Sequence, residues 1–594
     1  MSTPVANRGP GRSLRLTLPF GAVLAAMAVS VAAAPTYSVN KVLVAEDQYQ
    51  GEKWLDPAPL YKPHEVVVAD KPQIWITSNE REGHAGITVF GPRNRVLAVV
   101  NIEEPGLEFT PEAEEETIGN ETEEDVPEPN FPSEVRFNPT VCLPVKLYPR
   151  SAAPTYTDPA TNKVYELPVW NEDPSYVCAP LGAEGHARHP HGIDLDRRRD
   201  LIYQVIEHAG LKWNVTRSGF EIAETTDDES GMLLVYSITK PGKPTIVDGF
   251  LLGHGAHEVA VNEKNGKVFQ GNHEDSPGVV PPIWVDVIDR GLDNPYGFID
   301  TGYYNAIQGI EVDEPLKQVF GTTHVGETLF AFDGNCVPTA NDQPTAEKAQ
   351  GENCILYSVD LREPFLDQIA DAEEILAQID SEPGVGVWLL PSVLHMHDLT
   401  VDPESHRAYQ TLHSIHHAEH TGSPEEAALE DPPEDAEAEP EQHFMGRWVA
   451  AVDVDPRSKG FKEVRYIDLS NGYSALEYPN ADEVPPEQLM TSFVHAHWVA
   501  ADPKRKTVLV TGEHTGNLGV VETKEKTKEG IRLTQVVPIS IGIPGCEPPV
   551  DETGAPVTPE PHVHGVQINP KSGEAYVSDE GEECFYESVT ILKP

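Results

Sequence analysis

One pattern recurs seven times along the chain, and this recurrence constrains the fold more than any other feature. Each copy starts at an anchor residue, continues through three or four alternating residues typical of a strand, and then makes a polar turn. A second apolar run follows the turn. The anchors are His64, His191, His257, Gln308, His397, His497 and His564. Such self-similarity is the signature of a repeat architecture.

The spacing inside each copy predicts the first two strands of a β-propeller blade. An aromatic residue in the second strand lies twelve residues after the anchor at Phe269, Phe320, Tyr409 and Tyr576. Apolar runs at 233–238 and 448–454 fit the later strands of a blade. Seven four-stranded units predict an all-β, seven-bladed β-propeller over 35–594. The clearest helical periodicity lies at 367–380, where we expect one loop helix.

The last copy is short of one strand. Roughly three strands' worth of chain follow His564, whereas a blade of this kind has four strands. The apolar segment 37–46 precedes the first anchor and has no place in the first blade. We therefore expect this N-terminal strand to complete the seventh blade and close the ring.

The beginning of the chain has the features of a secretory signal peptide over 1–34. Basic residues precede the apolar run LTLPFGAVLAAMAVS, which ends in small residues suited to cleavage near 32–34. No later segment approaches the roughly 18 apolar residues that a membrane-spanning helix needs. We expect a periplasmic or secreted protein without membrane insertion.

Six cysteines fit such an oxidising compartment. They allow about 15 pairings. We favour three local disulfides, each closing a loop within one structural unit, namely Cys142–Cys178, Cys336–Cys354 and Cys546–Cys584.

The composition is strongly acidic. Lys and Arg number 43 against 96 Asp and Glu, a formal net charge of −53, which argues against nucleic acid or anionic lipid as a partner. Part of this charge lies in two low-complexity insertions, 103–134 and 419–442, which are typical of solvated loops. The remaining acidity suits a saline environment.

Histidines mark the blade starts. In a propeller the first strand of each blade lines the central channel, so equivalent positions form a ring around one axis. A ring of six imidazoles predicts a metal site, because imidazole is a ligand for Cu, Zn, Fe and Ni. The candidate ligands are His64, His191, His257, His397, His497, His564 and His189. The alternative is a blade motif in which each histidine caps a strand by hydrogen bonding.

Strand geometry predicts the orientation and role of residues that lie beside the anchors or follow the second strands. Adjacent strand residues alternate faces, so Glu258 and Asp398 are expected to point away from the channel. Histidines that end second strands fit supporting roles better than ligand roles; they are His208, His273, His413 and His514. Glu327 and Asp275 each follow a second-strand histidine and are the candidate catalytic bases. Gln308 breaks the ring, which we expect to leave an open side for substrate.

Several catalytic motifs are absent from the sequence. We find no G-x-S-x-G elbow, P-loop, dinucleotide fingerprint or C-x-x-C-H haem motif. Paired cysteines also leave no thiolate nucleophile or thiolate copper site. Any chemistry is therefore expected at the metal.

The histidine-led blade starts resemble a known family. The stretch RHPHGIDLD at 188–196 is similar to the first histidine-rich blade start of the copper propeller of nitrous oxide reductase, but no Cys-rich cupredoxin domain is present in this sequence. A secreted, acidic propeller without that domain more closely resembles thiocyanate dehydrogenase, also called thiocyanate desulfurase. That family holds three copper ions in a histidine-rich channel and oxidises thiocyanate to cyanate and elemental sulfur.

The resemblance implies a copper-dependent oxidoreductase with several copper ions, a small anionic substrate and a cytochrome c electron acceptor. Three alternatives remain: a non-catalytic copper-binding or storage protein, a propeller scaffold that binds a protein partner, and another metal-dependent propeller enzyme such as a lyase. The sequence leaves open whether the chain forms a homodimer.

Overall fold

The structure is a computed structural model, and the part of the chain that it describes excludes several segments. The described residues are 36–69, 73–81, 84–102, 189–207, 231–252, 255–272, 285–289, 299, 301, 306–324, 327–336, 354–381, 392–417, 444–470, 495–524, 531–546, 561–581 and 584–594, with the backbone alone of the strands between 140 and 180, at 211–224 and at 296–298. The predicted signal peptide, 1–34, and both acidic insertions, 103–134 and 419–442, lie outside them.

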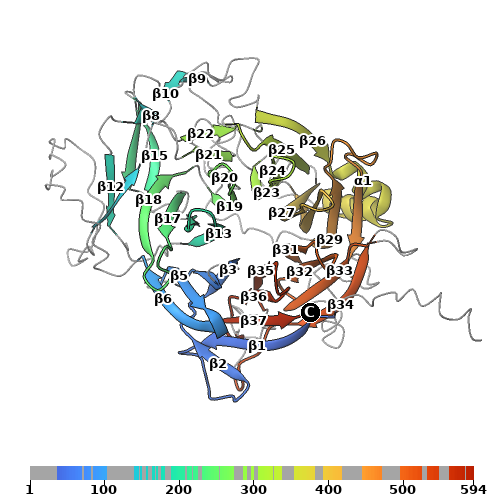
Figure 1. Ribbon diagram of the computed structural model, residues 1–594. Coiled ribbons are helices and arrows are strands. Elements are labelled where there is room, and N and C mark those ends of the chain that lie inside the picture. The colour runs from blue at the N-terminus through green and yellow to red at the C-terminus, as the bar shows by residue number, and fades with distance from the viewer. Residues whose placement is uncertain are drawn as a thin grey trace, which may run out of the picture. The chain divides into compact units, whose positions relative to one another are not determined.

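Seven antiparallel sheets stand in a ring, each with its first strand innermost (Figure 1). The first three blades comprise β3 (Pro63–Ala69), β4 (Ile74–Asn79), β5 (Gly86–Gly91) and β6 (Arg95–Asn101); β13 (Pro190–Asp196), β14 (Leu201–Ile206), β17 (Met232–Ser237) and β18 (Thr245–Leu251); and β19 (Ala256–Asn262), β20 (Lys267–Asn272), β21 (Val285–Asp289) and β22 (Tyr296–Ile299). The prediction of an all-β, seven-bladed β-propeller is confirmed.

The next three blades repeat this order. They comprise β23 (Ile307–Asp313), β24 (Gln318–Thr323), β25 (Thr328–Asp333) and β26 (Ile355–Asp360); β27 (Ser392–Asp402), β28 (Arg407–His417), β29 (Phe444–Asp453) and β30 (Val464–Asp468); and β31 (Ala496–Asp502), β32 (Thr507–Gly512), β33 (Asn517–Glu522) and β34 (Arg532–Pro538). The predicted single loop helix is two helices, α1 (Arg362–Gln368) and α2 (Ala372–Ser381). They are separate because Ile369 takes an extended conformation, with φ −94° and ψ 118°.

The seventh blade joins the two ends of the described chain. It orders β35 (Val563–Ile568), β36 (Ala575–Asp579), β37 (Ser588–Lys593), β1 (Ser38–Ala45) and β2 (Leu55–Ala58). β1 pairs antiparallel with β37, placing Val42 opposite Thr590 and Val44 opposite Ser588. The N-terminal strand therefore closes the ring, as the sequence predicted.

The second blade carries two additional strands. β7 (Thr140–Val145) and β12 (Ser175–Pro180) extend it outward beyond β18. Three further two-stranded pairs lie in the same region of the sequence: β8 (Tyr148–Pro149) with β11 (Val169–Trp170), β9 (Thr155–Thr157) with β10 (Val164–Glu166), and β15 (Leu211–Thr216) with β16 (Gly219–Glu224).

The apolar core lies between neighbouring blades. One cluster joins Ile76 and Ile87 of the first blade to Ile193 and Leu234 of the second. Another joins the seventh blade to the first through residues such as Tyr576. Each innermost strand also contacts the innermost strand of the next blade, and β35 contacts β3. Burial of apolar surface thus fixes the blades side by side around the axis.

The same irregularity occurs in all seven innermost strands. Between the residue before the anchor and the second residue after it, the pairing register slips by one residue. In the first blade, Pro63 pairs with Asn79 but Val66 pairs with Thr77. An extra residue of this kind is a β-bulge, which redirects side chains and is frequent next to functional sites.

Two of the expected disulfides are present: Cys336–Cys354 and Cys546–Cys584, with Cα–Cα distances of 5.5 and 5.6 Å. Cys142 and Cys178 are backbone partners in the β7–β12 pair, but their side chains lie outside the described part. The disulfides indicate an oxidising compartment. Among the described residues, no helix is long and apolar enough to cross a membrane.

Glycine at the bulge is needed where neighbouring blades approach most closely. A Cβ on Gly192 would contact the carbonyl oxygen of His257 and lie 2.9 Å from the Cα of Glu258. We therefore expect Gly192→Ala to lower the free energy of unfolding by about 1–3 kcal/mol, because neither backbone atom can move without separating two blades. Urea unfolding measures this change. Gly242→Ala is the matched control, since its new methyl meets only the Leu97 carbonyl oxygen, at 3.8 Å.

Candidate metal centre

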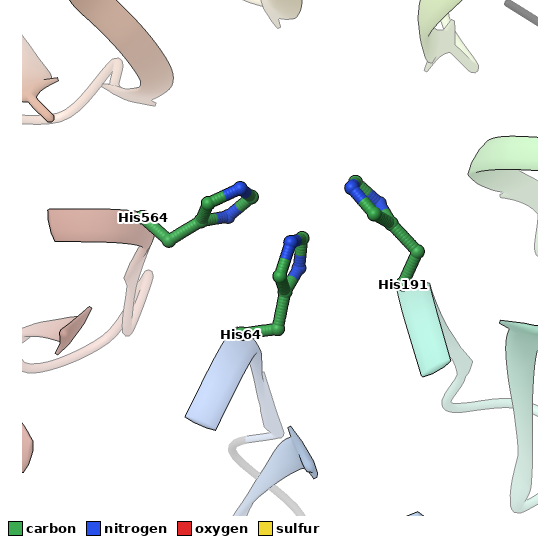
Figure 2. Close-up of side chains that lie close together, drawn as sticks. All are labelled: His64, His191 and His564. Atoms are coloured by element: carbon green, nitrogen blue, oxygen red, sulfur yellow. The ribbon is translucent and has the colours of Figure 1, made fainter. Parts of the chain in front are cut away.

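Six imidazoles from six blades surround the axis of the ring. Their centroid separations around the circle are 3.9 Å (His64–His191), 3.7 Å (His191–His257), 5.2 Å (His257–His397), 3.9 Å (His397–His497), 4.2 Å (His497–His564) and 3.4 Å (His564–His64). Figure 2 shows three of them pointing toward one another from three separate blades. We call these six residues the histidine ring; all are at least 95% buried.

Four members of the histidine ring are neutral nitrogen donors. Burial, followed by repulsion from neighbouring imidazoles, holds the pKa of His64, His397 and His564 well below the ordinary value. Burial likewise lowers the pKa of His497 to about 3. Neutral imidazole is the form that coordinates metal ions.

The hydrogen-bonding state of the ring also fits a metal. The Nδ1 atoms of His64, His397, His497 and His564 are buried and have no hydrogen-bond partner. Strand-capping histidines would use these atoms, so the capping alternative does not account for the ring. Donor atoms lie within 4.8 Å of one another in His64–His191–His564 and in His397–His413–His497, two groups that share no residue. The donor set fits at least two borderline-soft transition-metal ions.

Gln308 fills its place in the circle. Its Nε2 lies 3.4 Å from Nε2 of His257, and its Oε1 accepts a hydrogen bond from Nε2 of His395 at 2.9 Å. The side chain is 3% exposed. The expectation of an open side at this blade is therefore wrong, because the amide is long enough to bridge its neighbours.

A second circle, which we call the rim, lies beside the histidine ring. It consists of the residue two positions before each anchor and the residue sixteen positions after it. In five blades these two residues are joined by a backbone hydrogen bond, in which the N–H of the second residue donates to the carbonyl oxygen of the first. These pairs are Glu80 with Lys62, Glu207 with His189, His324 with Ala306, Glu513 with His495, and Glu580 with His562. The same bulged geometry therefore presents both positions at one end of the channel.

Side chains of the rim form a chain of ion pairs that crosses the blades. His189 contacts Glu207 of its own blade at 2.7 Å and Glu80 of the preceding blade at 2.8 Å. Lys62 repeats this bridge between Glu80, at 3.4 Å, and Glu580, at 3.1 Å. Lys62 and His189, each two residues before its anchor, thus link consecutive blades.

The chain continues on the other side of Lys62. His562 contacts Glu580 at 2.8 Å and also pairs with Glu513. Glu513 in turn lies 2.8 Å from Nδ1 of His495 and 3.2 Å from Nε2 of His413. His413, His495 and Glu513 form a further group of three donor atoms within 4.8 Å.

The rim carries charge where the histidine ring does not. Burial opposes protonation of His189 and His562, but the carboxylates on both sides outweigh it and raise the pKa of each well above the ordinary value. Burial likewise opposes ionisation of Glu580, yet His562 and Lys62 lower its pKa to about 2. The rim therefore carries compensating charges at His189, His562 and Glu580, whereas burial lowers the pKa of the rim residues His413 and His495.

Sequence reasoning missed the rim carboxylates, namely Glu80, Glu207, Glu513 and Glu580. A signal for them exists: each lies sixteen residues after its anchor, and the same offset gives His273, His324 and His413. The sequence prediction instead used His208 and His514, which lie seventeen residues after their anchors, one position beyond the rim carboxylates. His413, expected to be supporting, belongs to a candidate ligand group.

Glu258 and Asp398 do not point away from the channel, so that expectation is wrong. The bulge adds a residue at the anchor, and the residue after the anchor then faces the axis as well. Glu65, Glu258, Asp398 and Trp498 occupy this position and line one axial cavity. The Trp498 ring lies 4.5–6.3 Å from all six imidazoles and also lines that cavity.

Of the two candidate catalytic bases, Glu327 lies in the described part of the chain and Asp275 does not. Glu327 pairs with Arg362 and accepts the backbone N–H of Leu394 at 3.0 Å, contacts that attach β25 to α1 and β27. Its catalytic role stays a prediction. Asp275, like His208 and His273, lies outside the described residues. His189 belongs to the rim rather than the histidine ring.

Comparisons with known proteins give similarity in fold alone. No family model matches the chain, and no curated protein does. Among solved structures, Kuenenia stuttgartiensis hydrazine synthase is 10% identical with a TM-score of 0.42, covering 92% of this chain and 99% of that one. A Myceliophteria thermophila Cps50 (Swd1) β-propeller domain is 8% identical with a TM-score of 0.36, covering 76% and 98%. Such values carry no functional argument.

The rim makes a pH-dependent contribution to stability that a single substitution removes. Because the pKa of Glu580 falls from 4.5 to about 2, its ion pairs stabilise the fold by about 3 kcal/mol above pH 4.5, and this is lost as pH falls toward 2. In metal-free protein, Glu580→Gln should therefore lower the unfolding free energy at pH 7 much more than at pH 3. Urea unfolding at both pH values tests this, with exposed Glu463→Gln as control. An equal loss at both would contradict the assignment.

Proposed function

We propose that this protein is a periplasmic or secreted copper-dependent oxidoreductase that acts on a small inorganic anion, with thiocyanate as the best candidate. The observation that carries the proposal is the histidine ring: six buried imidazoles supplied by six blades, four of them with a pKa lowered by burial. The predicted signal peptide and the two disulfides support export.

Copper is the metal that the donor set favours. Imidazoles dominate, carboxylates are available at the rim, and no described cysteine is free. Among divalent first-row ions, such nitrogen-rich sites bind copper most tightly. Two donor groups without a shared residue support more than one ion per chain, and the group at His413, His495 and Glu513 adds mixed nitrogen and oxygen ligands. Bound copper would supply an electron acceptor and a Lewis acid for water.

Cationic groups at the rim suit an anionic substrate in an otherwise acidic protein. The Lys62 ammonium stands between Glu80 and Glu580, and protonated His189 and His562 flank those two carboxylates. Lys62 also has a φ of 49°, a conformation that costs a non-glycine residue energy and is concentrated at functional sites. We infer that Lys62 orients the anion.

The rim also provides a route for protons. Oxidation of thiocyanate by water gives cyanate and elemental sulfur and releases two protons and two electrons. The electrons leave to an external carrier, for which a cytochrome c is the candidate. The chain from Glu207 through Lys62 to His413 is a continuous series of groups that can accept and pass protons. We place the entry of substrate and water at the rim, where the cationic groups lie.

The non-catalytic alternatives account for fewer of these features. A storage protein needs donors but no strained backbone, whereas Lys62 and His495, both two before an anchor, have φ values of 49° and 61°. A partner-binding scaffold needs neither the unpartnered buried Nδ1 atoms nor the rim ion pairs.

Metal analysis tests the proposal. Protein dialysed against copper should bind two or more ions per chain, and His191→Ala/His397→Ala/His497→Ala should lose them while remaining folded. His84→Ala is the control, because this exposed imidazole stacks on Tyr61, at 4.2 Å, outside the ring. The loaded protein should then oxidise thiocyanate with a cytochrome or dye acceptor. Absence of stoichiometric metal would overturn the proposal, and metal without turnover would favour storage.

Lys62 provides a second, independent test. Lys62→Gln removes the ammonium but retains a hydrogen-bonding side chain, so we expect KM for thiocyanate to rise by about tenfold or more, equivalent to at least about 1.4 kcal/mol. Bound copper should be unchanged. An unaltered KM would remove the anion-orienting role from Lys62.

A further inference from the structure

A second compartment lies on the axis, on the other side of Trp498 from the rim. It is a cavity of ≈530 Å³ bounded by the innermost strands. Its lining contains one guanidinium, that of Arg197, and seven carboxylates: Glu65, Asp194, Glu258, Glu263, Glu311, Glu314 and Asp398. We call it the acidic cavity. The proposed oxidoreductase function uses none of these groups.

Two buried carboxyl groups of the acidic cavity are in contact with each other. Glu65 and Glu258 form a side-chain hydrogen bond with one another. Oε2 of Glu65 accepts the backbone N–H of Ile193 at 2.9 Å, whereas Oε1 of Glu65 and Oε1 of Glu258 are buried and accept no N–H or hydroxyl donor. Nδ1 of His191 lies 3.5 Å from Glu65, and Nδ1 of His257 lies 3.8 Å from Glu258. Two buried carboxyl groups in such contact need a shared proton or a bound cation between them.

Two of the remaining carboxylates are fixed in place by the neighbouring blade. Asp194 accepts the backbone N–H of Val261 at 2.7 Å, and Asp398 accepts that of Val499 at 2.7 Å. These bonds hold carboxyl groups close together around one axis. Burial, followed by the nearby Asp194, raises the pKa of Glu311 to about 8, and a bound cation would favour its ionised form.

The donor chemistry defines the class of cation. Seven carboxylates line the acidic cavity, and the two imidazole nitrogens near them are Nδ1 of His191 and Nδ1 of His257, so oxygen is the main ligand atom there. Carboxylate and water oxygens are the ligands of hard divalent ions. The volume exceeds that of a bare ion, so part of the coordination shell is water.

We propose that the acidic cavity binds a partly hydrated hard divalent cation, with Ca²⁺ as the representative, held by Glu65, Glu258 and Asp398. The cation stabilises the closed ring by neutralising residues that come from separate blades.

Luminescence of Tb³⁺, an oxygen-seeking substitute for Ca²⁺, gives a direct readout. Trp498 forms part of the cavity wall, so excitation of tryptophan should sensitise Tb³⁺ emission in the chelator-treated full chain, and Ca²⁺ should compete. Trp498→Phe should abolish the emission while calorimetry still detects Ca²⁺ binding. This result would place the ion beside Trp498 rather than on the acidic surface.

Two carboxylate variants complete the test. Glu65→Gln/Glu258→Gln and the single Glu311→Gln should each weaken Ca²⁺ binding at least about tenfold. Glu311 is the safer change, because its described hydrogen bond is to the adjacent Val312 N–H. The equal-charge control is Glu373→Gln/Glu374→Gln, two exposed residues of α2.

Three outcomes would contradict the proposed cation site. Absence of sensitised emission, emission that persists in Trp498→Phe, or affinity unchanged in both carboxylate variants would show that the cavity holds no such ion. The triple histidine variant should retain Tb³⁺ emission, so failure of the copper site and failure of this site remain distinguishable.

Discussion

The close approach of seven innermost strands to one axis is the constraint on which the rest of the structure depends. The strands meet so tightly that a Cβ on Gly192 or Gly309 would collide with the backbone of the neighbouring blade. The β-bulge at each anchor accommodates this crowding and turns two consecutive residues toward the axis. One local distortion, repeated seven times, therefore produces both the histidine ring and the carboxylate layer behind it.

Electrostatics divides the channel into three layers with different chemistry. Charged histidines and carboxylates compensate one another at the rim, as in the contacts of His562 with Glu580 and Glu513. In the histidine ring next to it, burial and mutual repulsion disfavour the protonated form of His64 and His397. The carboxylates of the acidic cavity follow on the other side, with Glu65 and Glu258 3.5 and 3.8 Å from His191 and His257. Nitrogen donors therefore dominate one layer and oxygen donors the next, which suits a soft transition metal in the first and a hard cation in the second.

Much of the fold could be predicted because its determinants are local. Strand alternation and turn residues recur at fixed spacing, and the unpaired apolar segment at 37–46 could only complete the last blade. The histidine ring followed from the same repeat. The rim did not, because Glu80 and Glu580 become functional through His189, Lys62 and His562, which reach them from other blades.

The sequence by itself determined the number of blades, the closing strand and the identity of the axial imidazoles, since each depends on periodicity along one chain. Tertiary structure alone decided that Glu258 and Asp398 face the channel, that Gln308 fills its gap and that Trp498 lies against all six imidazoles. The physical reason is that a bulge changes side-chain direction without changing the residue pattern. Contacts between blades, in turn, join residues whose separation in sequence carries no information about their distance.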